Sequence, residues 1–252
     1  MQKEIRKCTR NIINNMPIHN RILIKLSGGA ISGKERVGVS QESVNYITKE
    51  ILAVRDLGVQ TAIVVGGGNI FRGNLAEAWG IEKADADMVG MVSTVINCML
   101  LSSALKSQCD YDVRVMTAIP MPAVTEPYLR LKALKHLDNG AIVIFAGGIG
   151  QPFLTTDYTC VQRAVETRCE AVFVAKNGVD GVYCSDPNKD PSAVKFDTIS
   201  YQDVITRGIK VMDPAAFILA QEYSMKLNVF DFNAPGTMVK LLNGEKIGTV
   251  IK

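Results

Sequence analysis

Lys25 is the residue whose position in this sequence most strongly suggests a ligand. It lies in an apolar run, Arg21–Leu26, which is followed by Ser27 and two glycines. Burying a lysine is costly unless an anion compensates its charge, and a phosphate is such an anion. Backbone N–H groups can approach a phosphate closely at glycines, because no Cβ stands in the way. The stretch therefore predicts a phosphate-binding loop at the end of a buried strand.

Two further apolar runs also end in glycines. Residues 61–65 precede the glycines at 66–68, and residues 141–146 precede a glycine-rich segment at 147–150. For one loop alone, a purely structural turn explains the glycines as well as a ligand does. Three such loops favour a ligand, because open α/β sheets bind ligands at the carboxyl ends of their strands. The sequence thus predicts a phosphate-rich ligand, or two ligands that meet.

Several polar residues near these loops have a structural and a functional interpretation. Asp87 falls in the first turn of an expected helix, where it either compensates the helix dipole or accepts a hydrogen bond from a ligand hydroxyl. Its position alone favours the dipole. Thr155 or Thr156 fits a helix N-cap as well as a ligand contact. Tyr183 is either an ordinary hairpin aromatic or a platform for a nucleotide base.

The composition excludes several kinds of chemistry. The chain has 252 residues, 47% of them hydrophobic, and a net charge of only +3, which argues against nucleic acid as a partner. Its two histidines and six scattered cysteines indicate neither a zinc site nor a catalytic triad, so we expect no metal held by the protein itself. Without a signal-peptide pattern or an apolar stretch approaching about 20 residues, we predict a cytoplasmic protein without a membrane partner.

The candidate residues require a parallel sheet to bring them together. Apolar runs alternate with helical periodicity, which is typical of right-handed βαβ units. The pattern predicts strands at 21–26, 61–65, 113–118, 141–146, 171–176, 227–232 and 248–251. It predicts helices at 40–58, 85–107, 128–137 and 200–207, with others beginning after 156 and at 213. In the helix at 85–107, the expected inner face consists of Met88, Met91, Val92, Val95 and Met99.

The predicted fold class is α/β with a mostly parallel central sheet, in a single domain over residues 21–252. Residues 1–20 look like a poorly ordered N-terminal extension, in which Pro17 opposes a helix. Residues 32–39 are expected to form a polar surface loop, and 74–84 is irregular. Two turn signals, Asn177-Gly178 and Asp180-Gly181, predict a short hairpin after the strand at 171–176.

The common phosphate motifs are not present. Residues 68–75 lack the Gly-Lys-Ser/Thr ending of a Walker loop, and residues 66–71 fail the dinucleotide pattern at its last glycine. The chain is therefore neither an ordinary P-loop enzyme nor a Rossmann dehydrogenase.

An ordered set of other motifs carries a resemblance to a known family. KLSGGA at 25–30 resembles the nucleotide loop of the amino acid kinase family. Within that family the bacterial-type UMP kinases are matched by GGGNIFRG at 66–73, ADMVGM at 86–91, GQPFLTTD at 150–157, AKNGVDGVYCSDP at 175–187 and VMD at 211–213. Each motif alone is modest, but the ordered set is specific and extends from about residue 21 to the C-terminus.

The resemblance implies a three-layer αβα sandwich and transfer of the γ-phosphoryl group of ATP to UMP, with Mg²⁺, in pyrimidine nucleotide biosynthesis. For such a transfer, the expected catalytic residues are Lys25 and Arg72 as counter-charges and Asp157, which would organise the lysine or a metal-bound water. We expect the role of Asp157 to be structural and electrostatic rather than that of a general base. The resemblance implies ATP contacts from Lys25, Leu26, Ser27, Gly28, Gly68, Arg72, Asn177, Tyr183 and Asp186. It implies UMP contacts from Gly67, Asp87, Ile149, Gly150, Gln151, Pro152, Phe153, Leu154, Thr155 and Thr156. Asp87 would then accept from the ribose, against the dipole interpretation.

The resemblance also implies a homohexamer, UTP as an inhibitor and GTP as an activator. The sequence departs from the family at Gly29, where most of these enzymes have a glutamate. Because Lys25 and the loop amides remain, phosphate binding is expected to persist. The loop at 32–39, where GTP activation is usually felt, is divergent in sequence.

Two other functions stay open. One is a kinase of the same fold that acts on a carboxylate, such as acetylglutamate or aspartate, although residues 150–157 favour UMP. The other is a nucleotide-binding sensor or storage protein without turnover, which only the altered first loop supports.

Overall fold

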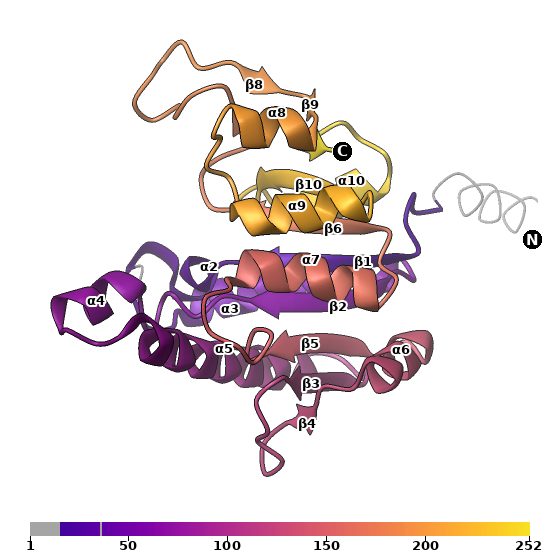
Figure 1. The fold of residues 1–252 in the computed structure, drawn as a ribbon. Coiled ribbons are helices and arrows are strands. Elements are labelled where there is room, and N and C mark those ends of the chain that lie inside the picture. The colour runs from indigo at the N-terminus through magenta and orange to yellow at the C-terminus, as the bar shows by residue number, and fades with distance from the viewer. Residues whose placement is uncertain (1–15, 36) are drawn as a thin grey trace, which may run out of the picture.

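A nine-stranded sheet forms the centre of the computed structural model, which describes residues 16–35 and 37–252 (Figure 1). Its strands lie in the order β4-β3-β5-β2-β1-β6-β10-β11-β9. Neighbouring strands run parallel except β10 and β11, which are antiparallel. The strands are β1 (Arg21–Leu26), β2 (Gln60–Val65), β3 (Val113–Thr117), β4 (Glu126–Pro127), β5 (Ile142–Ala146), β6 (Ala171–Lys176), β9 (Thr198–Ile199), β10 (Lys226–Asp231) and β11 (Thr249–Ile251).

Helices cover both faces of the sheet, so the three-layer arrangement expected from the sequence is confirmed (Figure 1). The helices are α2 (Gly28–Ser32), α3 (Gln41–Asp56), α4 (Gly73–Ala78), α5 (Lys83–Lys106), α6 (Arg130–Asp138), α7 (Thr156–Glu166), α8 (Tyr201–Thr206), α9 (Pro214–Glu222) and α10 (Thr237–Leu242). One core lies between the sheet and α3, α5 and α10, and a second lies between the sheet and α6, α7 and α9.

The alternation of side chains along β1 decides the direction in which Lys25 projects. Ile22, Ile24 and Leu26 belong to the core under α3 and α5, whereas Leu23 belongs to the core under α7. Successive side chains of a strand point to opposite faces. Lys25 therefore projects to the α7 face, at the end of the strand.

The long helix α5 corrects one prediction. Met91 and Val95 are buried as expected, but Met88, Val92 and Met99 are 40%, 38% and 36% exposed. The buried face continues instead through Cys98, Leu101 and Leu105. Because apolar residues lie on all sides of this helix, their periodicity does not define which side faces the sheet.

The same helix also contradicts the expectation that no apolar stretch is long enough to span a bilayer. By length and composition, α5 could cross a membrane. In the fold, however, Val95, Cys98, Leu101 and Leu105 pack into the core, and the helix contacts β2, β3 and β5. This packing is that of a core helix in a globular domain.

Short elements are where the structure departs most from the sequence predictions. The glycines of the first loop lie in a short helix, α2, and residues 33–35 form a single turn of 3₁₀ helix in the expected loop. The hairpin exists, but it joins β7 (Val182–Tyr183) to β8 (Lys195–Phe196) across residues 184–194. The predicted Asn-Gly and Asp-Gly turns only lead into it. Helices α4 and α10 and strands β4 and β9 were not predicted.

The expectation for an extension at 1–20 falls mostly on residues 1–15, outside the described residues. Residues 16–20 lie against the domain. Ile18 donates its amide to the Leu242 carbonyl over 2.8 Å, and Asn20 donates to Glu170 through its amide and its side chain.

Candidate active site

The loops after β1 and β2 are packed so closely that there is no room for a Cβ at Gly28. A Cβ on Gly28 would lie 2.5 Å from Asn69 Oδ1 and 2.7 Å from the Gly68 nitrogen. The Gly66 amide donates to the Leu26 carbonyl over 2.9 Å. Two predicted ATP-binding segments, at 25–28 and at 68, are thus in contact at the carboxyl ends of neighbouring strands.

Gly67 joins this site to the long helix. A Cβ on Gly67 would lie 2.7 Å from the Gly90 carbonyl oxygen and 2.8 Å from Ser93 Cβ, both in α5. Nothing lies within 4 Å of the corresponding position at Gly68. Gly67 therefore permits the close approach of α5, whereas the space beside Gly68 is open to a ligand.

Lys25 and Asp157 form an ion pair at the centre of the site. Lys25 Nζ lies 2.7 Å from Asp157 Oδ1, and their side chains are 9% and 19% exposed. Asp157 is the second residue of α7, whose N-cap is Thr155: the Thr155 hydroxyl accepts from the Asp157 amide. The structural interpretation of Thr155 is thus confirmed, and the cap places Asp157 over the end of β1.

The surroundings of Asp157 keep it ionised. Burial alone would raise the pKa of Asp157. The charge and hydrogen bond of Lys25, the charge of Lys176 and the amide of Asp213 outweigh burial, so the pKa lies below its ordinary value. A carboxylate with a lowered pKa is a poor general base at neutral pH.

The loop between β5 and α7 contains the predicted UMP contacts and is connected to Asp87. Asp87 Oδ2 accepts the Phe153 amide over 2.8 Å, and its other oxygen accepts from Lys83. Because α5 begins at Lys83, Asp87 lies beyond the expected first turn. Phe153 has a backbone φ of 71°, which residues other than glycine rarely adopt, and the residue is 66% exposed. Asp87 therefore holds a strained exposed loop beside the glycine-rich strand ends.

The other residues of this loop differ in exposure. Gln151 and Thr155 are exposed, whereas the rest are partly buried, namely Ile149, Gly150, Pro152, Leu154 and Thr156. Gly150 has φ 82°, and a Cβ there would lie 3.2 Å from the Ala118 carbonyl oxygen. The loop thus lies close to the end of β3.

Arg72 lies at the outer edge of the site. Its side chain is exposed, and its Nε donates to the Gly68 carbonyl over 2.7 Å. This contact places a cation beside the Gly67–Gly68 turn.

Two cavities adjoin Lys176, at the end of β6. One, of about 720 Å³, is lined by residues that include Ser27, Gly29 and Asn177. The other, of about 480 Å³, is lined by residues that include Tyr183 and Asp186. The Tyr183 hydroxyl donates to Asp180 over 2.5 Å. Tyr183 and Asp186 are therefore separated from the glycine loops, with Lys176 between the two groups.

Sequence reasoning missed a buried polar network behind the glycine loops. Asn97 of α5 donates to the Gly66 carbonyl over 2.8 Å and exchanges hydrogen bonds with Asn69. Asn69 also donates to Gly38, and Thr94 accepts the Gly147 amide over 2.9 Å. Asn97 is wholly buried in an otherwise apolar stretch. That placement was the available signal, since buried amides are generally hydrogen-bonded.

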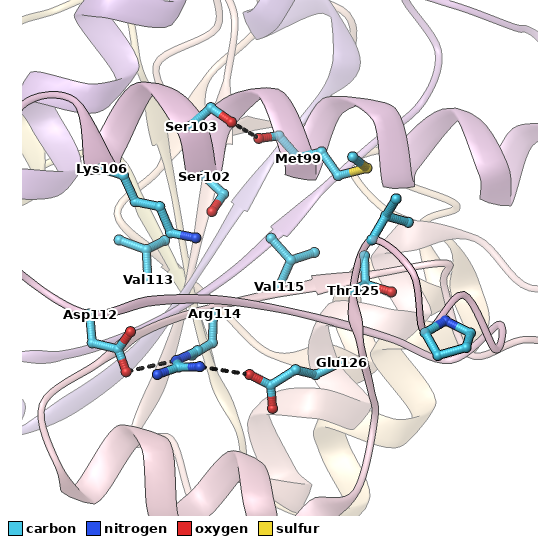
Figure 2. Close-up of a pocket in the computed structure, with 12 residues that line it drawn as sticks. Met99, Ser102, Ser103, Lys106, Asp112, Val113, Arg114, Val115, Thr125 and Glu126 are labelled. Atoms are coloured by element: carbon cyan, nitrogen blue, oxygen red, sulfur yellow. Dashed lines mark hydrogen bonds and ion pairs between the residues drawn. The ribbon is translucent and has the colours of Figure 1, made fainter.

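A third cavity, of about 560 Å³, lies elsewhere, between α5, β3 and the loop before β4 (Figure 2). Arg114 crosses its floor, donating to Asp112 over 2.7 Å and to Glu126 over 3.2 Å. The Lys106 amine points into the cavity from α5 (Figure 2). His136 contacts the same Glu126 over 3.1 Å, so its interpretation as a satisfied helix residue is confirmed. No predicted site residue lines this cavity.

The arrangement of these side chains and loops suits the binding of phosphate groups at the carboxyl ends of the strands. A buried, ion-paired lysine lies where amide-lined loops meet, and a separate loop held by Asp87 faces the same strand ends. Such a site can position phosphates and neutralise their charge, which is most of what phosphoryl transfer requires.

The chain belongs to the amino acid kinase family, whose model matches residues 20–231. It is similar to proteins of one kind within that family. The uridylate kinase of Frankia casuarinae is 52% identical over 236 residues, which are 94% of this chain and 91% of that protein. The crystal structure of UMP kinase from Bacillus anthracis superposes with a TM-score of 0.91 at 50% identity, over 93% of this chain and 96% of that one. The UMP kinase of Ureaplasma parvum gives a TM-score of 0.87 at 32% identity, over 92% and 98%.

Proposed function

We propose that this protein phosphorylates UMP with ATP, giving UDP and ADP. The observation that carries the proposal is the buried Lys25–Asp157 pair at the meeting point of the glycine loops. The likeness to uridylate kinases over nearly the whole chain supports this substrate. The site would supply charge and position, because a phosphate acceptor needs little help from a general base.

The donor ATP would lie along the ends of β1 and β6. Lys25, Ser27, Gly28 and the Leu26 backbone would bind its phosphates, with Gly68 and Arg72 on the other side. Asn177, Tyr183 and Asp186 would bind the adenosine, since they line the cavities that adjoin Lys176.

The acceptor UMP would lie against the loop between β5 and α7. Gly67 would contact its phosphate, Asp87 its ribose, and residues 149–156 its uracil. Asp87 already accepts two hydrogen bonds, and a carboxylate has lone pairs left for a ribose hydroxyl. Both nucleotides would thus present their phosphates to Lys25.

In the transfer step Lys25 would neutralise charge that develops on the migrating phosphoryl group. Asp157 would hold Lys25 in position and stay ionised, consistent with its lowered pKa. The attacking oxygen of UMP is already anionic, so no proton has to be removed from it.

Mg²⁺ would enter with the phosphates of ATP. Within the described part of the chain, no three His, Cys, Asp or Glu side chains lie close enough to hold a metal. The site therefore fits a cation held chiefly by phosphate and water, as Mg²⁺ commonly is in kinases. When bound, the ion would help to neutralise the polyphosphate.

A turnover assay tests the substrate. With Mg-ATP as donor, UMP should be preferred to CMP, dUMP, acetylglutamate and aspartate. Preference for a carboxylate would overturn the proposal. A protein that binds nucleotides without turnover would instead be the sensor.

The remaining proposals concern regulation and setting. We propose inhibition by UTP, activation by GTP, a homohexameric assembly and a cytoplasmic location, as the family resemblance implies. The assay with and without each nucleotide tests the first two. An unchanged rate at saturating GTP would remove GTP from the proposal.

A further inference from the structure

Lys176 is a third ionisable group of the Lys25–Asp157 cluster. Val172 and Val174 of β6 lie in the core under α7, whereas Phe173 and Ala175 lie in the other core. The alternation puts Lys176 on the α7 face, like Lys25. Strands β1 and β6 are parallel neighbours with Lys25 opposite Val174, so both lysines project from adjacent strand ends.

The segment Val211–Asp213 holds this cluster from the other side. The Val211 carbonyl accepts from Lys176 Nζ, and the Asp213 amide donates to Asp157 Oδ2 over 3.2 Å. This gives a role to a motif that the proposed function leaves unexplained. The Val211 carbonyl engages one of the three N–H donors of the Lys176 ammonium, so the other donors can bind a ligand.

The cluster carries an excess of positive charge. Lys25 and Lys176 supply two cations against the single carboxylate of Asp157. Burial and the charge of Lys25 lower the pKa of Lys176 to about 8, although Asp157 opposes the shift. An anion placed beside both lysines would relieve this cost.

Lys176 lines both cavities on the donor side. One contains Ser27 and Asn177, and the other contains Tyr183 and Asp186. A nucleotide with its base near Tyr183 and its terminal phosphates at the Ser27 loop must pass Lys176. We propose that Lys176 binds the polyphosphate of the donor nucleotide directly and is thus a further catalytic residue of the site. This inference rests on the proposed arrangement of ATP.

Nucleotide affinities test the inference without relying on turnover. In Lys176→Met, affinity for ATP and ADP should fall by about tenfold or more, whereas affinity for AMP should change by less than about twofold. Lys176→Arg should recover part of the loss. Lys135→Met, at an exposed lysine of α6, is the matched control and should bind all three like the parent.

Steady-state kinetics provide a second measurement. In Lys176→Met, kcat/KM for ATP should fall on the order of 10²-fold, with little change in the KM for UMP. If Lys176 had a purely structural role, its replacement would weaken the binding of ATP, AMP and UMP alike. Equal losses, or an unchanged ratio of ATP to AMP affinity, would overturn the inference. An inactive parent would instead contradict the proposed UMP kinase activity. The ratio of ATP to AMP affinity would then still test the role of Lys176.

The parent alone offers a test in case the variants do not fold. Lys25 of β1 and Asp157 and Cys160 of α7 are the titratable groups that act on Lys176. Phosphate should raise the pKa of Lys176 above its free value near 8, so ATP binding takes up a proton above that pH. Affinity for ATP relative to AMP should therefore fall as pH rises beyond about 8. A flat ratio up to pH 10 would count against the contact.

Discussion

The sequence predicted that the buried charge of Lys25 needs a partner, but it did not identify that partner. The apolar neighbours of Lys25 predicted that an anion must compensate its charge, and the structure supplies Asp157 as a partner 2.7 Å away. The pairing itself was not predictable from spacing, because the two residues are far apart in the chain. It depends on the alternation of β1 and on the N-cap that fixes the start of α7.

Removing either member of the Lys25–Asp157 pair should affect stability and activity differently. Asp157→Asn leaves a buried lysine without its closest counter-charge, so unfolding in urea should show a loss of up to about 3 kcal/mol. The Lys25→Met/Asp157→Asn double variant should recover much of this loss. Its kcat should nonetheless stay on the order of 10²-fold or more below the parent, as in each single variant.

The pH dependence of that stability has a definite sign. Because the pKa of Asp157 is lowered in the fold, the contribution of its charge to stability is complete above its unfolded pKa of about 4. It is lost as the pH falls through the folded value. The difference between the parent and Asp157→Asn should therefore shrink in acid. For the activity prediction, a Lys25→Met/Asp157→Asn protein with the kcat of the parent would show that the charges of this pair are not needed for catalysis.

Asp87 shows a contact that its position in the sequence did not predict. Its place near a helix start favoured dipole compensation, yet its carboxylate accepts the Phe153 amide. Asp87→Ala should raise the KM for UMP by about tenfold or more, because it removes the proposed ribose acceptor and the hydrogen bond to the Phe153 amide. The KM for ATP should change by less than about twofold. Equal effects on both substrates would place Asp87 outside the UMP site. Lys83→Ala, which removes only the exposed partner of Asp87, is the control.

At the scale of elements, the predictions were most accurate where the apolar runs and helix caps were clearest. Strands β1 and β6 have the predicted bounds, and Ser40, Ser200 and Asp213 cap helices as expected. Helices α4 and α10 have six residues each and were missed, because so short a stretch shows little periodicity. The prediction of the inner face of α5 was partly wrong, because both sides of this helix carry apolar residues.

The packing of α5 against the β2 loop predicts opposite results for adjacent glycines. Gly67→Ala would bring its Cβ 2.7 Å from the Gly90 carbonyl oxygen, so α5 or the loop must move. We expect a loss of about 1–3 kcal/mol in urea unfolding. Gly68→Ala meets nothing within 4 Å and should unfold like the parent. Gly68→Ala should still weaken ATP binding, because the added methyl group would enter the proposed phosphate site. Equal stability of both variants would contradict the packing argument.

At the scale of the whole molecule, the parallel order of strands brings the separate motifs together. Strand β2 lies on one side of β1 and β6 on the other, with β5 beyond β2. The loops that follow these strands therefore meet at one edge of the sheet, where open α/β sheets bind ligands. The sequence predicted this edge from its glycines. It did not predict the Asn69–Asn97 network behind it, because that contact joins a loop to a distant helix face.

The outer side of α5 bears an apolar stripe that we propose as part of an interface in the proposed homohexamer. Met88, Val92, Ile96 and Met99 recur at helical spacing and are each at least 36% exposed. Contiguous exposed apolar surface of this kind commonly marks an interface. Ile96→Glu should therefore produce a smaller species in sedimentation velocity, because burying the new charge would be costly. Val194→Glu, at an exposed apolar residue outside any helix, should leave the assembly intact. A parent that sediments as a monomer, or an Ile96→Glu protein that sediments like the parent, would exclude this stripe as an interface.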